Sequence, residues 1–253
     1  MSKNFELMQQ AEIGVGSASA LTNVGIATDL RNRESTIPAA VTAIESVVRE
    51  ESLKLVQRLF LSAKKPSPKA VMFAAVDAGN GCSCLCAITA KLLAESVPGS
   101  VCLVEANFRA PSLPAVFGVD NHHGLADSLR QEGAIRGFAK QAGRDNLWLL
   151  SAGALGKDSL SLLNSGRVKD RIAELRSEFD YLLIDAPPLS AYADGMILGR
   201  LADGAVLVLE ANTTRREAAL RVTESLRAMK VPVLGAVLNN RTFPIPDVVY
   251  KRL

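Results

Sequence analysis

The sequence predicts an α/β protein built on a doubly wound, mostly parallel sheet with helices on both faces. Short apolar runs alternate with segments of helical period along residues 70–239. The runs are continuously apolar, as expected of parallel strands that are buried on both faces, whereas half-exposed strands would alternate. Successive strand–helix–strand units of this kind form an open sheet whose functional loops lie at the carboxyl ends of the strands.

The chain that precedes the sheet divides into a leader and a helix. Residues 1–40 mix Gly, Ser, Thr, Asn and charged residues with little apolar period, which predicts a loosely ordered leader. Residues 41–63 place apolar side chains such as Ile44 and Phe60 at helical intervals, and the prolines of "KKPSPK" end this helix. We therefore expect a single domain over residues 41–253 that includes the helix.

The strands and helices of the domain follow in alternation. Apolar, β-rich runs predict strands at 70–76, 100–106, 147–152, 181–186, 204–211 and 231–239. Spacers of helical period include 84–96, 161–179 and 214–230. There is no internal repeat or low-complexity tract, so one sheet accounts for this part of the chain.

Composition and charge bear on the partners and the compartment. The 29 basic and 26 acidic residues give a net charge of +3, and the basic residues are scattered, so we expect no nucleic-acid partner. No run of 18 apolar residues occurs, and the start "MSKNFELMQQAEIG" lacks the apolar core of a secretory signal. These features predict a cytoplasmic chain without direct membrane insertion, which would reach a membrane only through a partner.

Three of the four cysteines lie in the segment "CSCLC", as Cys82, Cys84 and Cys86, and the fourth is Cys102. This spacing matches neither a zinc ribbon nor a disulfide framework. Cys82 and Cys86 are expected to share a buried helix face as small side chains, and a metal or redox role is the alternative. A helix N-terminus also predicts a lowered pKa for the Cys82 thiol.

The segment "DAGNGCSC", residues 77–84, follows the first strand and opens a helix. Glycines such as Gly79 and Gly81 let backbone N–H groups cradle phosphate, the helix dipole favours an anion, and Ser83 is a candidate Mg²⁺ ligand. The standard loop is G-x-x-x-x-G-K-[ST], however, and here Val76 replaces the first glycine and Cys82 the lysine. The loop alone therefore indicates phosphate binding only weakly.

Two further strand ends carry polar side chains. Asp185 follows the apolar run of "FDYLLIDAPP" in the form of a Walker-B carboxylate, which holds Mg²⁺ directly or through water. The alternative is that Asp185 caps the junction between strand and loop. In "CLVEANFRAPSL", Glu105, Asn107 and Arg109 occupy alternating positions at the end of another strand.

Together these motifs resemble the cytoplasmic kinase domain of the bacterial tyrosine kinases (BY-kinases) of capsular and exopolysaccharide systems, relatives of the Min/ParA-type P-loop ATPases. The resemblance covers about residues 50–240. The family's G-E-G-K-S-T lies on residues 79–84 and its I-D-x-D-x-R-x-P on residues 104–111. Its Walker B, D-Y-[VIL]-[IL]-I-D-x-P-P, is matched in full over residues 180–188.

Weaker matches extend this resemblance along the chain. They are "HGLADSL" at 123–129, Asp194 in the loop after the Walker B, and "GAVLNN" at 235–240, whose Asn239 corresponds to an adenine-contacting residue of the family. The tail "FPIPDVVYKRL" looks like the ending of kinases from exosortase-associated loci.

The resemblance implies a P-loop NTPase type of fold and a site for ATP or ADP with Mg²⁺. The implied nucleotide-binding residues are Gly79, Gly81, Cys82, Ser83, Cys84 and Asn239. The implied metal ligands are Ser83, Asp185 and Glu105, and the residues of catalysis, if the chain is active, are Asp185, Glu105 and Arg109.

This sequence departs from the family at residues that carry chemistry. Cys82 replaces the lysine that stabilises the β- and γ-phosphates, and a thiol cannot supply that cation. Glu105 keeps the charge of one family aspartate with a longer reach, whereas Asn107 loses the charge of the other. Arg109 is retained. Weak nucleotide binding without turnover is therefore expected.

The features used for assembly and self-phosphorylation are also altered. The E-x-x-R-x-x-R of ring-forming family members is replaced by Glu51, Lys54 and Gln57, which form either a solvated stripe or an interface. The tyrosine-rich tail is missing, since the chain has only Tyr181, Tyr192 and Tyr250. Homo-oligomerisation stays an open alternative.

Three classes of function follow. The favoured one is a catalytically impaired BY-kinase homologue, a pseudokinase of exopolysaccharide or capsule biosynthesis, that binds a membrane polysaccharide co-polymerase of the Wzz/GumC type from the cytoplasm. The second is an active tyrosine autokinase or Min/ParA-like ATPase in which Arg109, Lys91 or a partner residue supplies the missing charge, although Lys91 lies more than two helical turns along. The third is a nucleotide-free or redox-responsive scaffold.

Overall fold

The computed structural model describes residues 39–62, 67–163 and 165–240, with the side chains of the first helix described from residue 48 onward. Almost all of the leader predicted over residues 1–40 lies outside these ranges, and so does the tail 243–253 with Tyr250. The predictions for those two segments stay predictions.

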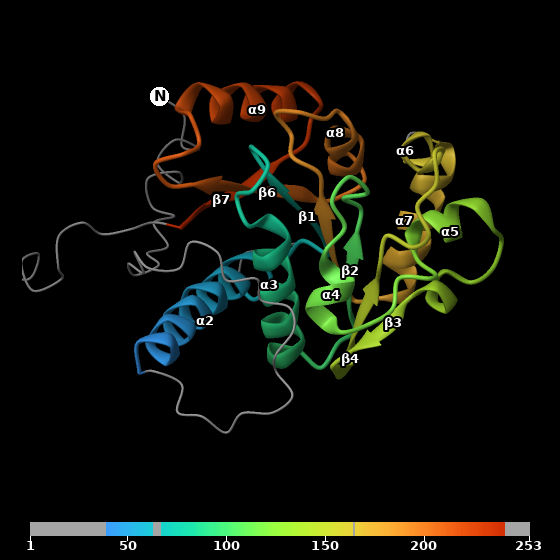
Figure 1. Ribbon diagram of the computed structural model, residues 1–253, viewed down its shortest axis with the longest axis horizontal. Coiled ribbons are helices and arrows are strands. Elements are labelled where there is room, and N and C mark those ends of the chain that lie inside the picture. The colour runs from blue at the N-terminus through green and yellow to red at the C-terminus, as the bar shows by residue number, and fades with distance from the viewer. Residues whose placement is uncertain (1–38, 63–66, 164, 241–253) are drawn as a thin grey trace, which may run out of the picture.

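Seven strands form one sheet in the order β3-β4-β2-β5-β1-β6-β7 (Figure 1). All neighbouring pairs are parallel except β3 and β4. The strands are β1 (Ala70–Ala75), β2 (Val101–Glu105), β3 (Lys140–Ala142), β4 (Arg144–Leu150), β5 (Tyr181–Ala186), β6 (Gly204–Glu210) and β7 (Val233–Asn239). The predicted doubly wound, mostly parallel sheet is therefore confirmed, and all six predicted strands are present.

The helices cover both faces of this sheet. They are α2 (Ala39–Leu59), α3 (Cys82–Ser96), α4 (Leu113–Phe117), α5 (Leu125–Arg130), the 3₁₀ turn η1 (Ile135–Phe138), α6 (Ser159–Leu162), α7 (Gly166–Glu178), α8 (Asp194–Gly199) and α9 (Arg216–Ala228). Buried side chains of α2, α3 and α4 form one core with the sheet, and those of α5, α7, α8 and α9 form the other. Burial on both faces explains why β1, β2 and β5 read as unbroken apolar runs.

Three details differ from the prediction. β3 is a short antiparallel edge strand with a register shift between Gln141 and Ala142, and its three residues are too few to give an apolar pattern. The helical segment 161–179 divides into α6 and α7. β7 lies at the other edge of the sheet, so most of its residues are only partly buried, whereas full burial was expected.

The helices α2 and α3 pack side by side on one face of the sheet (Figure 1). α2 ends at Leu59, four residues before the predicted end, and Phe60 stacks edge-on against Tyr181 with their ring centroids 5.9 Å apart. None of the helices in the described ranges has both the length and the apolar character that a membrane span requires.

Candidate nucleotide site

The loop of residues 77–81 connects β1, near the centre of the sheet, to the start of α3 (Figure 1). Gly79 and Gly81 adopt φ angles of 87° and 76°, in the left-handed region that favours glycine. A Cβ atom at Gly81 would clash with the side-chain amide of Asn239. Both glycines are therefore needed for the path of this loop, as the phosphate-loop interpretation expects.

The loop is fastened to the ends of β6 and β7 by side-chain amides. Asn239 Nδ2 donates to the carbonyl oxygen of Asn80 at 3.0 Å, and Asn80 Nδ2 donates to Thr214 Oγ1 at 2.7 Å. Thr214 Oγ1 in turn accepts the backbone N–H of Glu210 at 2.9 Å. Asn239, matched to an adenine-contacting residue, thus supports the phosphate loop in this structure.

The start of α3 presents free donors beside this loop. The backbone N–H groups of Gly81, Cys82 and Ser83 find no hydrogen-bond acceptor among the residues that the structure describes, and no side chain caps this helix. Unpaired N–H groups and the positive end of a fifteen-residue helix suit an anion such as phosphate.

Cys82 turns its side chain into the protein. The residue is buried, and its pKa lies well above the ordinary value because burial disfavours the thiolate and the nearby Asp185 carboxylate disfavours it further. The expected lowering of this pKa is therefore wrong, since burial and the carboxylate outweigh the helix terminus. Cys86, one turn later, is also buried, so the two thiols share a face as predicted.

Asp185 lies at the end of β5, directly beside Glu105 of β2 and Phe73 of β1 in the strand register. It is 1% exposed, and its pKa is raised to about 7, first by burial and then by the negative charge of Glu105, although Ser83 and Cys82 act in the opposite direction. Neither carboxylate oxygen makes a hydrogen bond of ordinary geometry within the described chain. These buried oxygens are available to a cation.

Glu105 uses its carboxylate within the fold. Oε1 accepts the backbone N–H groups of Ser112 at 2.5 Å and Leu113 at 2.7 Å, and Oε2 accepts that of Ala152 at 3.0 Å. Burial is the main cause of its raised pKa, which these three bonds partly offset. The predicted role of Glu105 as a metal ligand is untested, and the carboxylate already holds the start of α4 and the end of β4.

The other two residues of the segment after β2 behave differently from each other. Asn107 Oδ1 is buried and has no hydrogen-bond partner among the described residues. Arg109 donates from Nη2 and Nε to Asp194 Oδ2, at 2.8 and 3.2 Å, and its guanidinium lies 3.8 Å from the ring centroid of Tyr192. The arginine thus joins this segment to the β5–α8 loop.

The sequence-predicted residues therefore gather at the carboxyl ends of the strands, but their side chains make different contacts. Ser83 and the Asp185 oxygens fit a Mg²⁺ ion, whose remaining ligands would come from phosphate and water. Within the described ranges no three His, Cys, Asp or Glu side chains form a metal cluster, so this ion would depend on a nucleotide. Cys84 is exposed beside the loop.

Sequence reasoning missed Thr214 and Ser190, which fix the loop from outside. Ser190 Oγ donates to Asp77 Oδ1 at 2.8 Å, and its backbone N–H donates to the carbonyl of Val76. Both residues follow the ends of predicted strands, where functional loops converge. That position is the feature of the sequence that could have identified them.

The sheet and the loop after β1 define a fold of the P-loop NTPase type. The chain is 28% identical to the tyrosine-protein kinase YwqD of Bacillus subtilis over 202 residues. This alignment covers 80% of this chain and 85% of that protein. It is 23% identical to the putative tyrosine-protein kinase CapB of Staphylococcus aureus over 195 residues, 77% of this chain and 85% of that protein. The chain is therefore a homologue of the bacterial tyrosine-protein kinases. No family model matches it.

Solved structures agree on the fold. The kinase domain of the Escherichia coli tyrosine kinase ETK superposes with a TM-score of 0.72 at 21% identity, over 87% of this chain and 86% of that one. The septum site-determining protein MinD of Pyrococcus horikoshii, solved with Mg-ADP, gives a TM-score of 0.60 at 20% identity, over 72% and 76% of the chains. The structural neighbours are thus tyrosine-kinase domains together with MinD-type ATPases.

Proposed function

We propose that this protein is a catalytically impaired BY-kinase homologue that keeps a weak Mg-nucleotide site and acts as a scaffold or regulator. The observation that carries this proposal is at position 82, where a buried thiol beside Asp185 replaces a lysine. Phosphoryl transfer depends on positioning and on cations that balance the developing charge. A neutral, inward-facing thiol supplies neither.

The proposed nucleotide site uses residues in and around the loop of residues 77–81. The N–H groups at the start of α3 would bind phosphate, Ser83 and Asp185 would hold Mg²⁺, and Asn239 and Thr214 would keep the loop in shape. When bound, Mg²⁺ would neutralise phosphate charge. The side chains therefore support binding and orientation more than turnover.

The alternative of an active tyrosine autokinase or ATPase needs a replacement for the missing lysine. Arg109 is engaged with Asp194 and Tyr192, and Lys91 Nζ lies 4.6 Å from the ring centroid of Phe117. Both cations are thus engaged with other side chains. A residue from a partner is the remaining source for an active enzyme.

The proposed partner is the cytoplasmic part of a membrane polysaccharide co-polymerase of the Wzz/GumC type in capsule or exopolysaccharide biosynthesis. The similarity to bacterial tyrosine-protein kinases supports this proposal through the family resemblance. A cytoplasmic protein held at the inner membrane through this partner is consistent with the helices of the described ranges, none of which could span a membrane. We also propose that residues 41–253 act as one domain, which is supported by the packing of α2 on α3.

Titration calorimetry with Mg-ATP and Mg-ADP tests the nucleotide site. We expect weak binding to the natural chain, no phosphotyrosine, and tighter binding to Cys82→Lys and to Cys82→Lys with Asn107→Asp. Ser96→Lys, an exposed position at the other end of α3, is the matched control and should not tighten binding. Turnover that survives in the natural chain but is lost in Asp185→Ala would favour the active alternative, and equal binding by all variants would contradict the placement of residue 82.

A further inference from the structure

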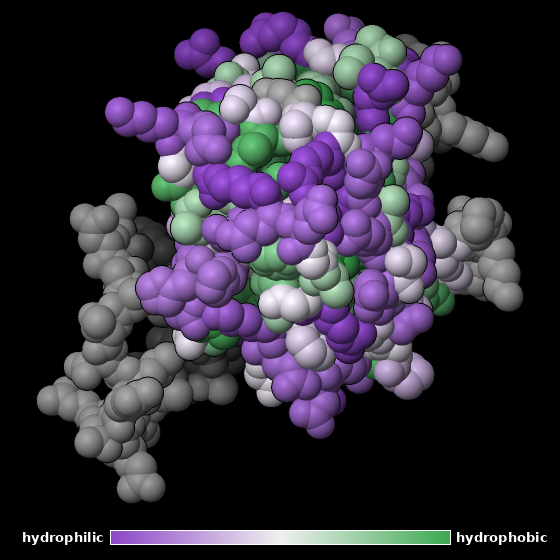
Figure 2. Space-filling model, turned by 90° about the vertical axis from the view of Figure 1, so that its right-hand side faces the viewer, coloured by the Kyte–Doolittle hydropathy of each residue, from purple (hydrophilic) through white to green (hydrophobic). Residues whose placement is uncertain are grey.

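The two edges of the sheet are protected to different degrees. β3 has three residues, contains Lys140 and carries a register shift, and these features discourage pairing with another strand. The side of the molecule that carries this edge is largely hydrophilic (Figure 2). β7 has seven residues, "VLGAVLN", with no charged side chain. An uncharged edge strand of this length is a template for pairing unless something covers it.

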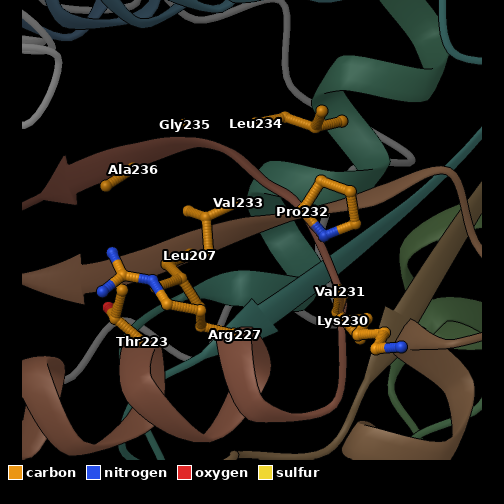
Figure 3. A pocket seen from close by; sticks show the side chains of 10 residues that line it. All are labelled: Leu207, Thr223, Arg227, Lys230, Val231, Pro232, Val233, Leu234, Gly235 and Ala236. Carbon is orange, nitrogen blue, oxygen red and sulfur yellow. The ribbon is translucent and has the colours of Figure 1, made fainter. Parts of the chain in front are cut away.

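A cavity of about 290 Å³ lies between β7 and α9, next to this edge. Figure 3 shows Val233 and Leu207 pointing into it from the strands, and Thr223 and Arg227 reaching toward it from α9. Val233 is 37% exposed, which is unusual for a valine in the sheet of this protein. The lining is completed by Lys230, Val231, Pro232, Leu234, Gly235 and Ala236.

The charged side chains that line this groove are both positive. Arg227 and Lys230 are its two charged lining residues, both are exposed, and neither forms an ion pair with any residue in the described ranges. Among the residues that the structure describes, no acidic side chain lines the cavity. An apolar floor beside an uncharged strand edge, flanked by two cations, suits an extended chain that carries both apolar and acidic side chains.

We propose that the β7 edge and this groove, here called the β7 groove, bind an extended acidic segment of another protein as an added strand. Backbone hydrogen bonds to β7 would supply affinity, alternate apolar side chains would fill the cavity beside Val233, and acidic side chains would pair with Arg227 and Lys230. This inference does not depend on nucleotide binding at the other site.

Charge disfavours two other occupants. A second copy pairing antiparallel at β7 would bring the cationic groove of each chain to the same side of the joined sheet, where Arg227 and Lys230 would meet like charges. The chain's own residues 241–253 contain Arg241, Lys251 and Arg252 but only one acidic side chain, Asp247. An acidic partner is therefore the occupant that the groove favours.

The test uses the full-length protein and two fluorescent ten-residue peptides, VTETVTETVT and the same sequence with lysine in place of glutamate. Both place the valines and the charged residues on one face of the added strand. Fluorescence anisotropy should show the glutamate peptide binding at least tenfold more tightly than the lysine peptide. Hydrogen exchange should slow at residues 233–239 when it binds. Arg227→Glu with Lys230→Glu should reverse the preference. Arg200→Glu with Arg221→Glu, an equal charge change at two exposed residues outside the cavity, should leave it unchanged.

Three results would overturn the proposal. The first is no binding of the glutamate peptide, or equal binding of both peptides. The second is a preference that persists in the Arg227→Glu, Lys230→Glu variant. The third is strong exchange protection of residues 233–239 in the free protein that is lost when residues 241–253 or 1–38 are removed, because the chain would then cover its own edge.

Discussion

The guanidinium of Arg109 donates two hydrogen bonds to the carboxylate of Asp194, at 2.8 and 3.2 Å, and so ties the segment after β2 to the start of α8. Asp194 is nearly buried, with a side chain 9% exposed, and the side chain of Arg109 is 29% exposed. Tyr192 lies against the guanidinium. This contact fixes two loops that border the candidate nucleotide site, while it occupies an arginine that the family resemblance assigns to catalysis.

A double-mutant cycle measures this contact. Arg109→Ala should lower the free energy of unfolding by about 2–4 kcal/mol, because it leaves the Asp194 carboxylate buried without its partner. Asp194→Ala in the same background should restore part of that loss, with a coupling of roughly 1–2 kcal/mol from urea unfolding. The exposed pair Arg49 and Glu95 is the control, and its coupling should stay below about 1 kcal/mol. Equal couplings for the two pairs would mean that burial does not strengthen the first.

Glu105 offers a second prediction, because its carboxylate accepts three backbone N–H groups. In Glu105→Gln the side-chain NH₂ would face donors, and at least one buried N–H would lose its acceptor. We expect a loss of about 2–4 kcal/mol in the free energy of unfolding, measured in urea. Glu95→Gln, at an exposed site on α3, serves as the control with a change of roughly 0.5 kcal/mol or less.

Glu105→Asp separates the structural role from the family's motif. The shorter side chain restores the aspartate of the family but should not reach Ser112, Leu113 and Ala152 together, so it should also destabilise the protein. If this variant is as stable as the natural chain, the three hydrogen bonds contribute little and Glu105 is free for another role.

Much of the fold was predictable because it depends on burial. Strands such as β1 and β5 are covered on both faces, and their unbroken apolar runs are the direct consequence. β3 was missed because an exposed edge strand of three residues has no such requirement. The partial exposure of β7 was missed for a related reason, since strand order, which decides the edges, depends on crossovers that local periodicity does not report.

The site was predicted as a set of positions and less well as a set of interactions. Asp185, Ser83 and the two loop glycines gather at the carboxyl end of β1, as strand-end reasoning expected. The direction of the Cys82 side chain could not be read from spacing, because it depends on the packing of α3 against β5. For that reason the pKa of Cys82 is raised, whereas the sequence predicted a lowered pKa.

Burial also orders the reactivity of the four thiols. Burial raises the pKa of all four thiols, but Cys84 is exposed, whereas Cys82, Cys86 and Cys102 are buried. Iodoacetamide on the native protein should therefore alkylate Cys84 at least tenfold faster than the other three, as followed by peptide mass spectrometry. Cys84→Ser should remove the fast phase. Labelling of Cys82 at the rate of Cys84 would mean that residue 82 faces solvent and that its thiol is not held beside Asp185.

The raised pKa of Asp185 predicts a dependence of stability on pH. Its pKa is about 7 in the folded chain, above the ordinary value of 3.8, so the unfolded chain releases this proton first as the pH rises. The stability that the protonated form contributes is complete below the ordinary pKa and is lost as the pH rises to about 7. Asp185→Asn, which cannot ionise, escapes this loss.

Urea unfolding at several pH values measures the difference between Asp185→Asn and the natural chain. This difference should grow by roughly 2–3 kcal/mol in favour of the variant between about pH 5 and pH 7, and then level off, because each pH unit in that window corresponds to about 1.4 kcal/mol. Asp203→Asn is the control: burial raises the pKa of Asp203, but hydrogen bonds from Ala70 and Arg176 outweigh it and leave that pKa lowered. Its difference from the natural chain should be flat over the same window, and a flat result for Asp185→Asn as well would mean that Asp185 is ionised in the folded protein throughout.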